Sequence, residues 1–115
     1  MTSISTHVLD VHGGTPASGI IIDVLQQIGG RWHTLKSVVT NADGRCDEFV
    51  LTDAAIGTYE FLFHIGDYYK ARGVELPEPA FLQQVPVRFS VAEVDGHYHV
   101  PLIVSPWNYQ VYRGS

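Results

Sequence analysis

The stretch Thr58-Tyr59-Glu60-Phe61-Leu62-Phe63-His64-Ile65 has the clearest structural pattern, because a large apolar side chain stands at every second position. Successive side chains of a β-strand point to opposite faces, so these apolar residues share one face. Val85-Pro86-Val87-Arg88-Phe89-Ser90-Val91 alternates in the same way, and Gly19-Ile20-Ile21-Ile22-Asp23-Val24-Leu25 is rich in β-branched residues. We predict strands at all three stretches, with core residues at Tyr59, Phe61, Phe63, Ile65, Val85, Val87, Phe89 and Val91.

Turn-forming residues recur at short intervals between these stretches. They include Gly13-Gly14, Gly29-Gly30, Asn41-Ala42-Asp43-Gly44, Gly57, Pro77-Glu78-Pro79 and Ser105-Pro106. Many short strands separated by turns are typical of an antiparallel β-sandwich. We therefore predict an all-β fold.

Two further patterns predict a hairpin and a helix. Asp95-Gly96 stands between two alternating stretches, and this pair suits the positive φ angles of a two-residue hairpin turn. Gly66-Asp67-Tyr68-Tyr69-Lys70-Ala71-Arg72-Gly73 predicts the only helix, with Asp67 as its N-cap and Gly73 as its C-terminal stop.

Length, charge and cysteine content limit the classes of function. The chain has 115 residues, so we expect one domain over residues 1–115. A net charge of −5 disfavours binding to nucleic acid or to anionic membranes. Cys46 is the only cysteine, which excludes an intrachain disulfide, and residues 1–7 lack the features of a signal peptide. We expect a cytoplasmic protein.

The pattern His97-Tyr98-His99 is the most suggestive for chemistry. On a strand over 97–104 both imidazoles project from the face opposite Tyr98, where they could bind a metal or act as acid and base. Surface histidines without a catalytic role are the alternative. Zinc needs further ligands, and no cysteine pair or His-Glu motif supplies them, so no metal is expected.

Three other features bear on a possible site. Arg45 follows the Asp43-Gly44 turn, where its guanidinium could hold an anionic or carbonyl oxygen, or could simply be exposed. Cys46 is expected to be a small buried residue and not a nucleophile. The last four residues, Tyr112-Arg113-Gly114-Ser115, offer polar groups that could complete a pocket, and a frayed tail is the alternative.

Taken together, these segments resemble the 5-hydroxyisourate hydrolase family, the enzymatic relatives of transthyretin. The resemblance covers almost the whole chain. It rests on Ser5-Thr6-His7-Val8-Leu9-Asp10 with Gly14-Thr15-Pro16-Ala17-Ser18-Gly19, on Thr40-Asn41-Ala42-Asp43-Gly44-Arg45, on His97-Tyr98-His99-Val100-Pro101-Leu102 with Ser105-Pro106, and on the ending Tyr112-Arg113-Gly114-Ser115. Val111 departs from the threonine usual there, and Gly13-Gly14 lies in a variable turn.

The resemblance implies a transthyretin-like (prealbumin-like) sandwich of two four-stranded sheets with one short helix. It also implies a homotetramer, built as a dimer of dimers with active sites in the channel between dimers. The reaction it implies is hydrolysis of 5-hydroxyisourate to 2-oxo-4-hydroxy-4-carboxy-5-ureidoimidazoline in urate degradation, by water attack on a ring carbonyl. No cofactor is implied.

Position by position, the resemblance also implies the site residues. The catalytic residues it implies are His7, Arg45, His99 and Ser115. The substrate-binding residues it implies are His7, Arg45, Tyr112, Arg113 and Gly114. In this scheme a neutral histidine takes a proton from water, Arg45 stabilises the oxyanion, and His97 has a structural or supporting role.

Two other classes of protein remain as alternatives. A transthyretin-like carrier would bind a small molecule in the same channel without catalysis, but the resemblance implies that carriers lack the terminal Tyr-Arg-Gly-Ser and substitute the catalytic histidine and arginine positions. A structural or adaptor sandwich would have no pocket chemistry. A monomer would lack the channel and would argue against both the enzyme and the carrier.

Overall fold

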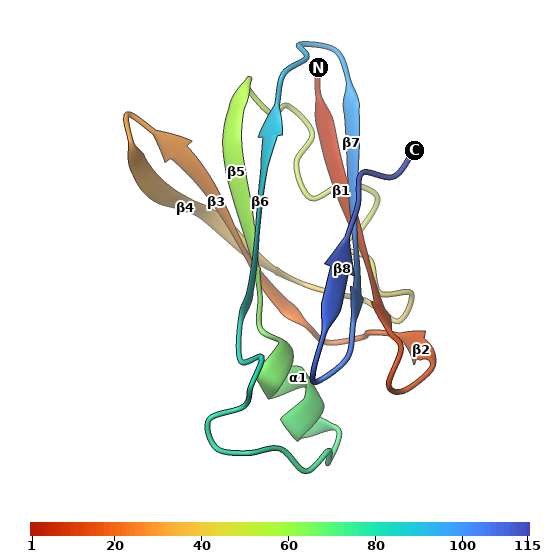
Figure 1. Cartoon of the computed structure of the whole chain (residues 1–115). Coiled ribbons are helices and arrows are strands. Elements are labelled where there is room, and N and C mark those ends of the chain that lie inside the picture. Colours follow the sequence, from red (N-terminus) through yellow and green to blue (C-terminus); the bar gives the residue numbers. More distant parts are fainter.

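The computed structural model describes residues 1–115, and its strands form two four-stranded sheets packed face to face (Figure 1). One sheet has the order β2-β1-β7-β8 and the other β4-β3-β5-β6. The elements are β1 (Ser3–Asp10), β2 (Thr15–Pro16), β3 (Ile21–Ile28), β4 (Arg31–Val39), β5 (Gly57–Phe63), α1 (Ile65–Ala71), β6 (Val85–Val91), β7 (His97–Val104) and β8 (Tyr109–Val111). The predicted all-β sandwich with one short helix is confirmed.

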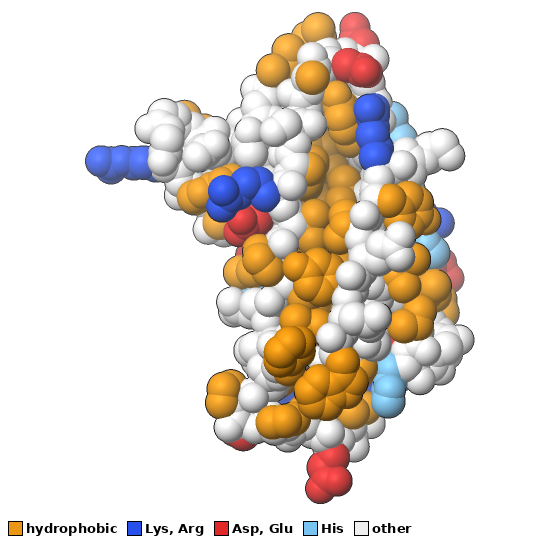
Figure 2. Space-filling model, in the orientation of Figure 1, with side chains coloured by type: hydrophobic (Ala, Val, Ile, Leu, Met, Phe, Trp, Pro, Cys, Tyr) orange, Lys and Arg blue, Asp and Glu red, His pale blue; other side chains and the backbone are white.

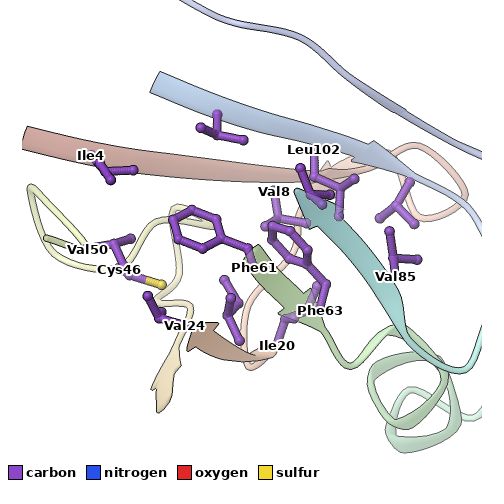
Figure 3. Packing of buried hydrophobic residues seen from close by; sticks show 14 of the residues in the cluster. Ile4, Val8, Ile20, Val24, Cys46, Val50, Phe61, Phe63, Val85 and Leu102 are labelled. Carbon is purple, nitrogen blue, oxygen red and sulfur yellow. The ribbon is translucent and has the colours of Figure 1, made fainter. Parts of the chain in front are cut away.

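The core lies between the two sheets and contains 22 buried hydrophobic residues. Figure 3 shows Phe61 and Phe63 of β5 reaching toward the other sheet, with Phe63 next to Val8 and Leu102. Seven of the eight predicted core residues are buried, and Phe89 is partly buried because β6 is an edge strand. Burial of each such large side chain stabilises the fold by about 1.5–3 kcal/mol.

One strand pairing departs from the antiparallel pattern. β1 and β7 run parallel, in register from Ser3 opposite His97 to Asp10 opposite Val104. Both strands therefore present alternate residues to the same outer face of their sheet. This pairing of the first strand with a late one brings the N-terminal residues beside the two histidines of β7.

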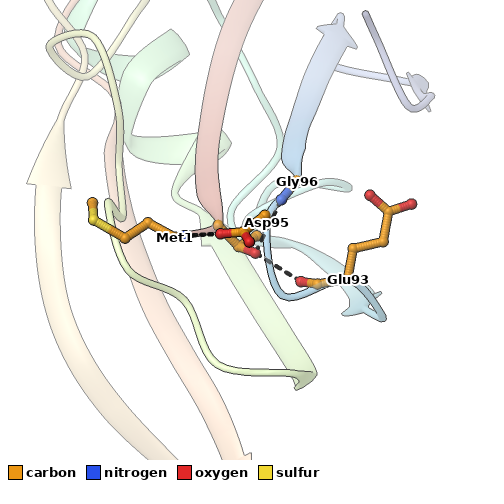
Figure 4. Close-up of polar contacts among 5 residues, drawn as sticks. Met1, Glu93, Asp95 and Gly96 are labelled. Atoms are coloured by element: carbon orange, nitrogen blue, oxygen red, sulfur yellow. Dashed lines mark hydrogen bonds and ion pairs between the residues drawn. The ribbon is translucent and has the colours of Figure 1, made fainter.

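The predicted hairpin at Asp95-Gly96 is wrong, because β6 and β7 belong to different sheets. Both edges of β7 are occupied, by β1 and β8, so the segment between β6 and β7 crosses from one sheet to the other. Neither Asp95 nor Gly96 has a positive φ. Thr2 fixes this connecting segment, since its Oγ1 donates a hydrogen bond to the Glu93 carbonyl (2.7 Å) and accepts one from the Gly96 N–H (3.3 Å). The Met1 amino group contacts the Asp95 carboxylate (Figure 4).

The helix lies where it was expected, but its start was wrongly predicted. α1 begins at Ile65, a fully buried residue, so His64 and not Asp67 occupies the N-cap position. Asp67 lies in the first turn, where its carboxylate faces the positive end of the helix dipole and accepts a hydrogen bond from Gln83 (3.0 Å). Gly73 has a φ of 78° just beyond the helix, which confirms the predicted stop.

Asp10, at the end of β1, ties α1 to the sandwich. The hydroxyls of Tyr68 and Tyr69 donate to its carboxylate at 2.9 and 2.7 Å. Burial alone would raise the pKa of Asp10, but hydrogen bonds from Tyr69, from the Gly13 N–H and from Tyr68 outweigh it and lower that pKa.

The helix α1 has seven residues, and the structure contains no helix with the length and apolar character needed to cross a membrane.

Candidate active site

The outer face of the β1–β7 pair contains the predicted pair of histidines. The rings of His97 and His99 are nearly parallel, at an interplanar angle of 13° and a centroid distance of 6.4 Å. Between them lies Tyr98, which points the other way and is buried in the core. The prediction that the two imidazoles project together is confirmed.

Two serines of β1 hold these imidazoles. Ser3 Oγ lies 2.7 Å from Nδ1 of His97, and Ser5 Oγ lies 2.7 Å from Nδ1 of His99. Ser5 Oγ also lies 3.3 Å from Nε2 of His97, so its hydroxyl joins the two rings. Sequence reasoning missed both serines. Their alternation with His7 was visible, but the identity of the strand beside them was not.

His7 and Arg45 reach the same face from different directions. His7 stands opposite Pro101, two residues beyond Ser5 on β1, and is therefore a diagonal neighbour of His99. Arg45 is brought there by Gly44, whose carbonyl accepts a hydrogen bond from the Val8 N–H (2.9 Å). Gly44 has a φ of 75°, and a Cβ on it would lie 2.5 Å from the Val8 oxygen, so only glycine allows this approach.

The surroundings of His99 disfavour its protonated form. Burial lowers the pKa of His99, and electrostatic repulsion from the nearby Arg45 lowers it further. The free nitrogen of the ring, Nε2, has no hydrogen-bond partner, since Ser5 occupies Nδ1. These surroundings favour the neutral imidazole of His99, with one nitrogen available to accept a proton.

The C-terminal residues are not a frayed tail. The Gly114 N–H donates to the carbonyl of His99 at 2.8 Å, and the chain passes so close that a Cβ on Gly114 would lie 2.6 Å from Cδ2 of the His99 ring. Ser115 follows directly. The end of the chain therefore borders the imidazole, in the predicted region.

Tyr112 and Arg113 face elsewhere within this chain. Both line a groove of about 410 Å³ between the edge strands β6 and β8. The Arg113 guanidinium donates to the carbonyl of His97 (3.3 Å) and stacks over the Tyr98 ring, 4.2 Å from its centroid. The structure thus brings His7, Arg45, His99 and Gly114 to one face and places Tyr112 and Arg113 on the other side of the terminal segment.

The remaining cysteine and histidine candidates lie outside this face and make structural contacts. Cys46 is buried, as predicted, and burial raises the pKa of its thiol to about 11, with a smaller effect from Asp47. His64 is hydrogen-bonded to Asp23, and His12 packs edge-on against Tyr69. No group of three or more His, Cys, Asp or Glu side chains is arranged to hold a metal ion.

Residues 4–114 match the model of the HIUase/Transthyretin family. The chain is 51% identical to 5-hydroxyisourate hydrolase 2 of Rhizobium meliloti (strain 1021) over 97% of this chain and 95% of the relative. It is similar in structure to Klebsiella pneumoniae 5-hydroxyisourate hydrolase, with a TM-score of 0.83, 31% identity and full coverage of both chains. Sea bream transthyretin in complex with thyroxine has a TM-score of 0.85 and 26% identity, over 97% of this chain and 94% of that one. These matches over nearly the full length show that the chain belongs to the HIUase/transthyretin family.

Proposed function

We propose that this chain is an enzyme that hydrolyses 5-hydroxyisourate. The observation that carries the proposal is the imidazole of His99, held by Ser5 with its Nε2 free, close to Arg45 on the outer face of the β1–β7 pair. A base and a cationic donor on one face suit the attack of water on a carbonyl. Relatives sharing about half of their residues with this chain are named 5-hydroxyisourate hydrolases, which supports the same substrate.

In the proposed mechanism, water attacks a ring carbonyl of the substrate. His99 accepts a proton from the attacking water through Nε2, and His7 shares in the proton transfer from its diagonal position. Arg45 stabilises the negative charge that develops on the carbonyl oxygen as the carbon becomes tetrahedral. Collapse of this intermediate breaks the bond to the ring nitrogen and opens the six-membered ring. No cofactor takes part.

The terminal residues complete the proposed site. Gly114 holds the chain end against His99, so that the Ser115 hydroxyl can orient the water or an imidazole. We place Tyr112 and Arg113 at the edge of the substrate pocket. Because both side chains line the groove between β6 and β8, their contact with substrate depends on neighbouring subunits.

The proposed assembly is a homotetramer, a dimer of dimers formed by one domain of residues 1–115. β6 and β8 are both edge strands, and unpaired edges on the same side of a sandwich favour pairing with a second copy. An apolar furrow runs between them in Figure 2, lined in part by Val87, Phe89 and Val111. Apolar surface of this kind is typical of subunit interfaces. We place this assembly in the cytoplasm.

The proposal is tested by generating 5-hydroxyisourate from urate with urate oxidase and following its ultraviolet absorbance. The substrate decays without catalysis, so decay must be recorded at once, with and without the protein. We expect the protein to accelerate the decay at catalytic concentrations. No acceleration by a tetramer of confirmed mass would contradict the proposal and would favour a carrier, the function class of transthyretin.

A further inference from the structure

The mechanism above leaves three polar side chains of the site unused. Ser3, His97 and Ser5 form with His99 one continuous line of hydrogen bonds, in which hydroxyls and imidazoles alternate. The three distances along the line are 2.7, 3.3 and 2.7 Å, from Ser3 to His99. Every member can both donate and accept a proton. Such a line can move a proton along its length as well as hold its members in place.

We propose that Ser5 positions His99 and links it to His97, so that His97 holds the positive charge created when His99 accepts the water proton, until His99 gives that proton to the leaving nitrogen. This proposal rests on the proposed hydrolysis and assigns two further residues, Ser5 and His97, to it. Neither touches the reacting atoms in this scheme. Ser5 acts on His99, and His97 acts through Ser5.

The first half of the relay accompanies the attack of water. Nε2 of His99 accepts the water proton as the oxygen bonds to the carbonyl carbon. The Nδ1 proton of His99 passes to Ser5 Oγ, and the Ser5 hydroxyl proton passes to Nε2 of His97. His99 is then neutral again, His97 is an imidazolium, and the tetrahedral oxyanion balances its charge.

The second half returns the proton. As the bond between carbon and ring nitrogen breaks, Nε2 of His99 donates to that nitrogen. Ser5 gives a proton back to Nδ1 of His99 and takes one from His97. Every group of the line has its starting proton again, the water proton has reached the leaving nitrogen, and no oxidation state has changed.

The positions of the two imidazoles suit this division of roles. His99 is partly buried and lies close to the guanidinium of Arg45, and both effects disfavour charge on its ring. His97 lies at the start of β7 and is exposed to water. Ser3 Oγ is within hydrogen-bond distance of its Nδ1. A charge held on His97 is therefore better solvated than the same charge held on His99.

A first test is the tautomer of His99, measured by ¹⁵N NMR of the protein labelled at its histidine nitrogens. The relay requires the proton of neutral His99 to sit on Nδ1, facing Ser5. We expect this tautomer in the wild-type protein and a mixture of tautomers in Ser5→Ala. A wild-type His99 with its proton on Nε2 would overturn the relay.

A second test is a double-mutant cycle on kcat with freshly generated substrate. Removing one hydrogen bond of the line by Ser5→Ala is expected to lower kcat by about tenfold with little change in KM, and His97→Gln, which cannot hold a proton, by a similar factor. Because both changes break the same line, Ser5→Ala/His97→Gln should be no slower than either single variant. Effects that multiply would contradict the proposal.

Two further variants distinguish the loss of the proton relay from a general loss of folding. Ser5→Thr keeps the hydroxyl and should retain most of the wild-type kcat, whereas a loss equal to that of Ser5→Ala would contradict a role for the hydroxyl. Ser37→Ala removes a serine hydroxyl from β4 of the other sheet, where it donates to Asp23, and should leave kcat unchanged. The NMR test needs no substrate, so failure of the relay is distinguishable from a wild-type protein without hydrolase activity.

Discussion

Two histidines of the molecule have different neighbours, His99 on β7 and His64, which follows β5 at the N-cap of α1. His64 Nε2 lies 2.8 Å from the carboxylate of Asp23, which also accepts a hydrogen bond from Ser37 at 2.6 Å. His99 has a hydroxyl on Nδ1, the guanidinium of Arg45 nearby and no carboxylate bonded to its ring. The carboxylate therefore occupies Nε2 of His64. Without one, His99 keeps a free nitrogen and its neutral form is favoured, which a base requires.

Among the variants that test this difference between the two histidines, Arg45→Gln is expected to have the largest effect on activity. Loss of the guanidinium removes the donor for the oxyanion, and kcat should fall by about 10²–10³-fold. It also removes a positive charge near His99, so the pKa of His99 should rise and the acid limb of the rate profile should move to higher pH.

The Arg45→Gln prediction is checked by kcat measured against pH, with Arg31→Gln on the exposed start of β4 as the control. A fall in kcat without movement of the acid limb would show that Arg45 does not set the charge of His99. Equal losses in both variants would contradict a specific role for Arg45.

An intermediate effect is expected from Gly114→Ala. The new methyl group would overlap Cδ2 of His99, and because that ring is held by Ser5 on its other side, the imidazole must turn out of place. Misplacement of a reacting group by about 1 Å lowers turnover by up to about 100-fold. We expect a fall in kcat with an unchanged melting temperature. Full activity would show that the terminus does not position His99.

The smallest effect is expected from Asp23→Asn, which removes the carboxylate beside His64 and should change stability but not activity. Hydrogen bonds from Ser37 and from His64 lower the pKa of Asp23 below that of the unfolded chain. A carboxylate whose pKa is lower in the folded protein than in the unfolded chain stabilises the fold at pH values above its unfolded pKa. This stabilisation is lost as the pH falls through the folded pKa. At pH 7 the variant should lose about 0.5–1 kcal/mol of unfolding free energy.

Denaturant unfolding of Asp23→Asn and the wild type at pH 7 and in acid measures this difference. It should shrink in acid, while kcat at pH 7 stays at the wild-type value. A loss of activity comparable to that of Gly114→Ala would break the distinction between the two faces.

Features that depend on local spacing were predicted from the sequence. Alternation placed Tyr59, Phe61 and Phe63 in the core and turned His97 and His99 to one face, since side-chain direction along a strand follows from position alone. Gly73 marked the end of α1 because a positive φ favours glycine. These signals need no knowledge of the rest of the fold.

Features that depend on strand partners were not predicted. Asp95-Gly96 has the composition of a hairpin turn, but the choice between pairing and crossing depended on β1 and β8, which occupy both edges of β7. The same parallel pairing puts Ser5 beside His99. The sequence left Arg45 open between a site residue and an exposed one, since local sequence does not show that Gly44 packs against β1.

The most direct test of the central claim compares His99→Asn with His64→Asn, using initial rates on freshly generated 5-hydroxyisourate. We expect His99→Asn to lose about 10²–10⁴-fold in rate, the usual contribution of a positioned acid or base, with the protein still folded. His64→Asn should retain the wild-type rate, because its imidazole is hydrogen-bonded to Asp23, away from the outer face of β1 and β7. Equal rates for all three proteins, or a loss confined to His64→Asn, would contradict the assignment of catalysis to the outer face of β1 and β7.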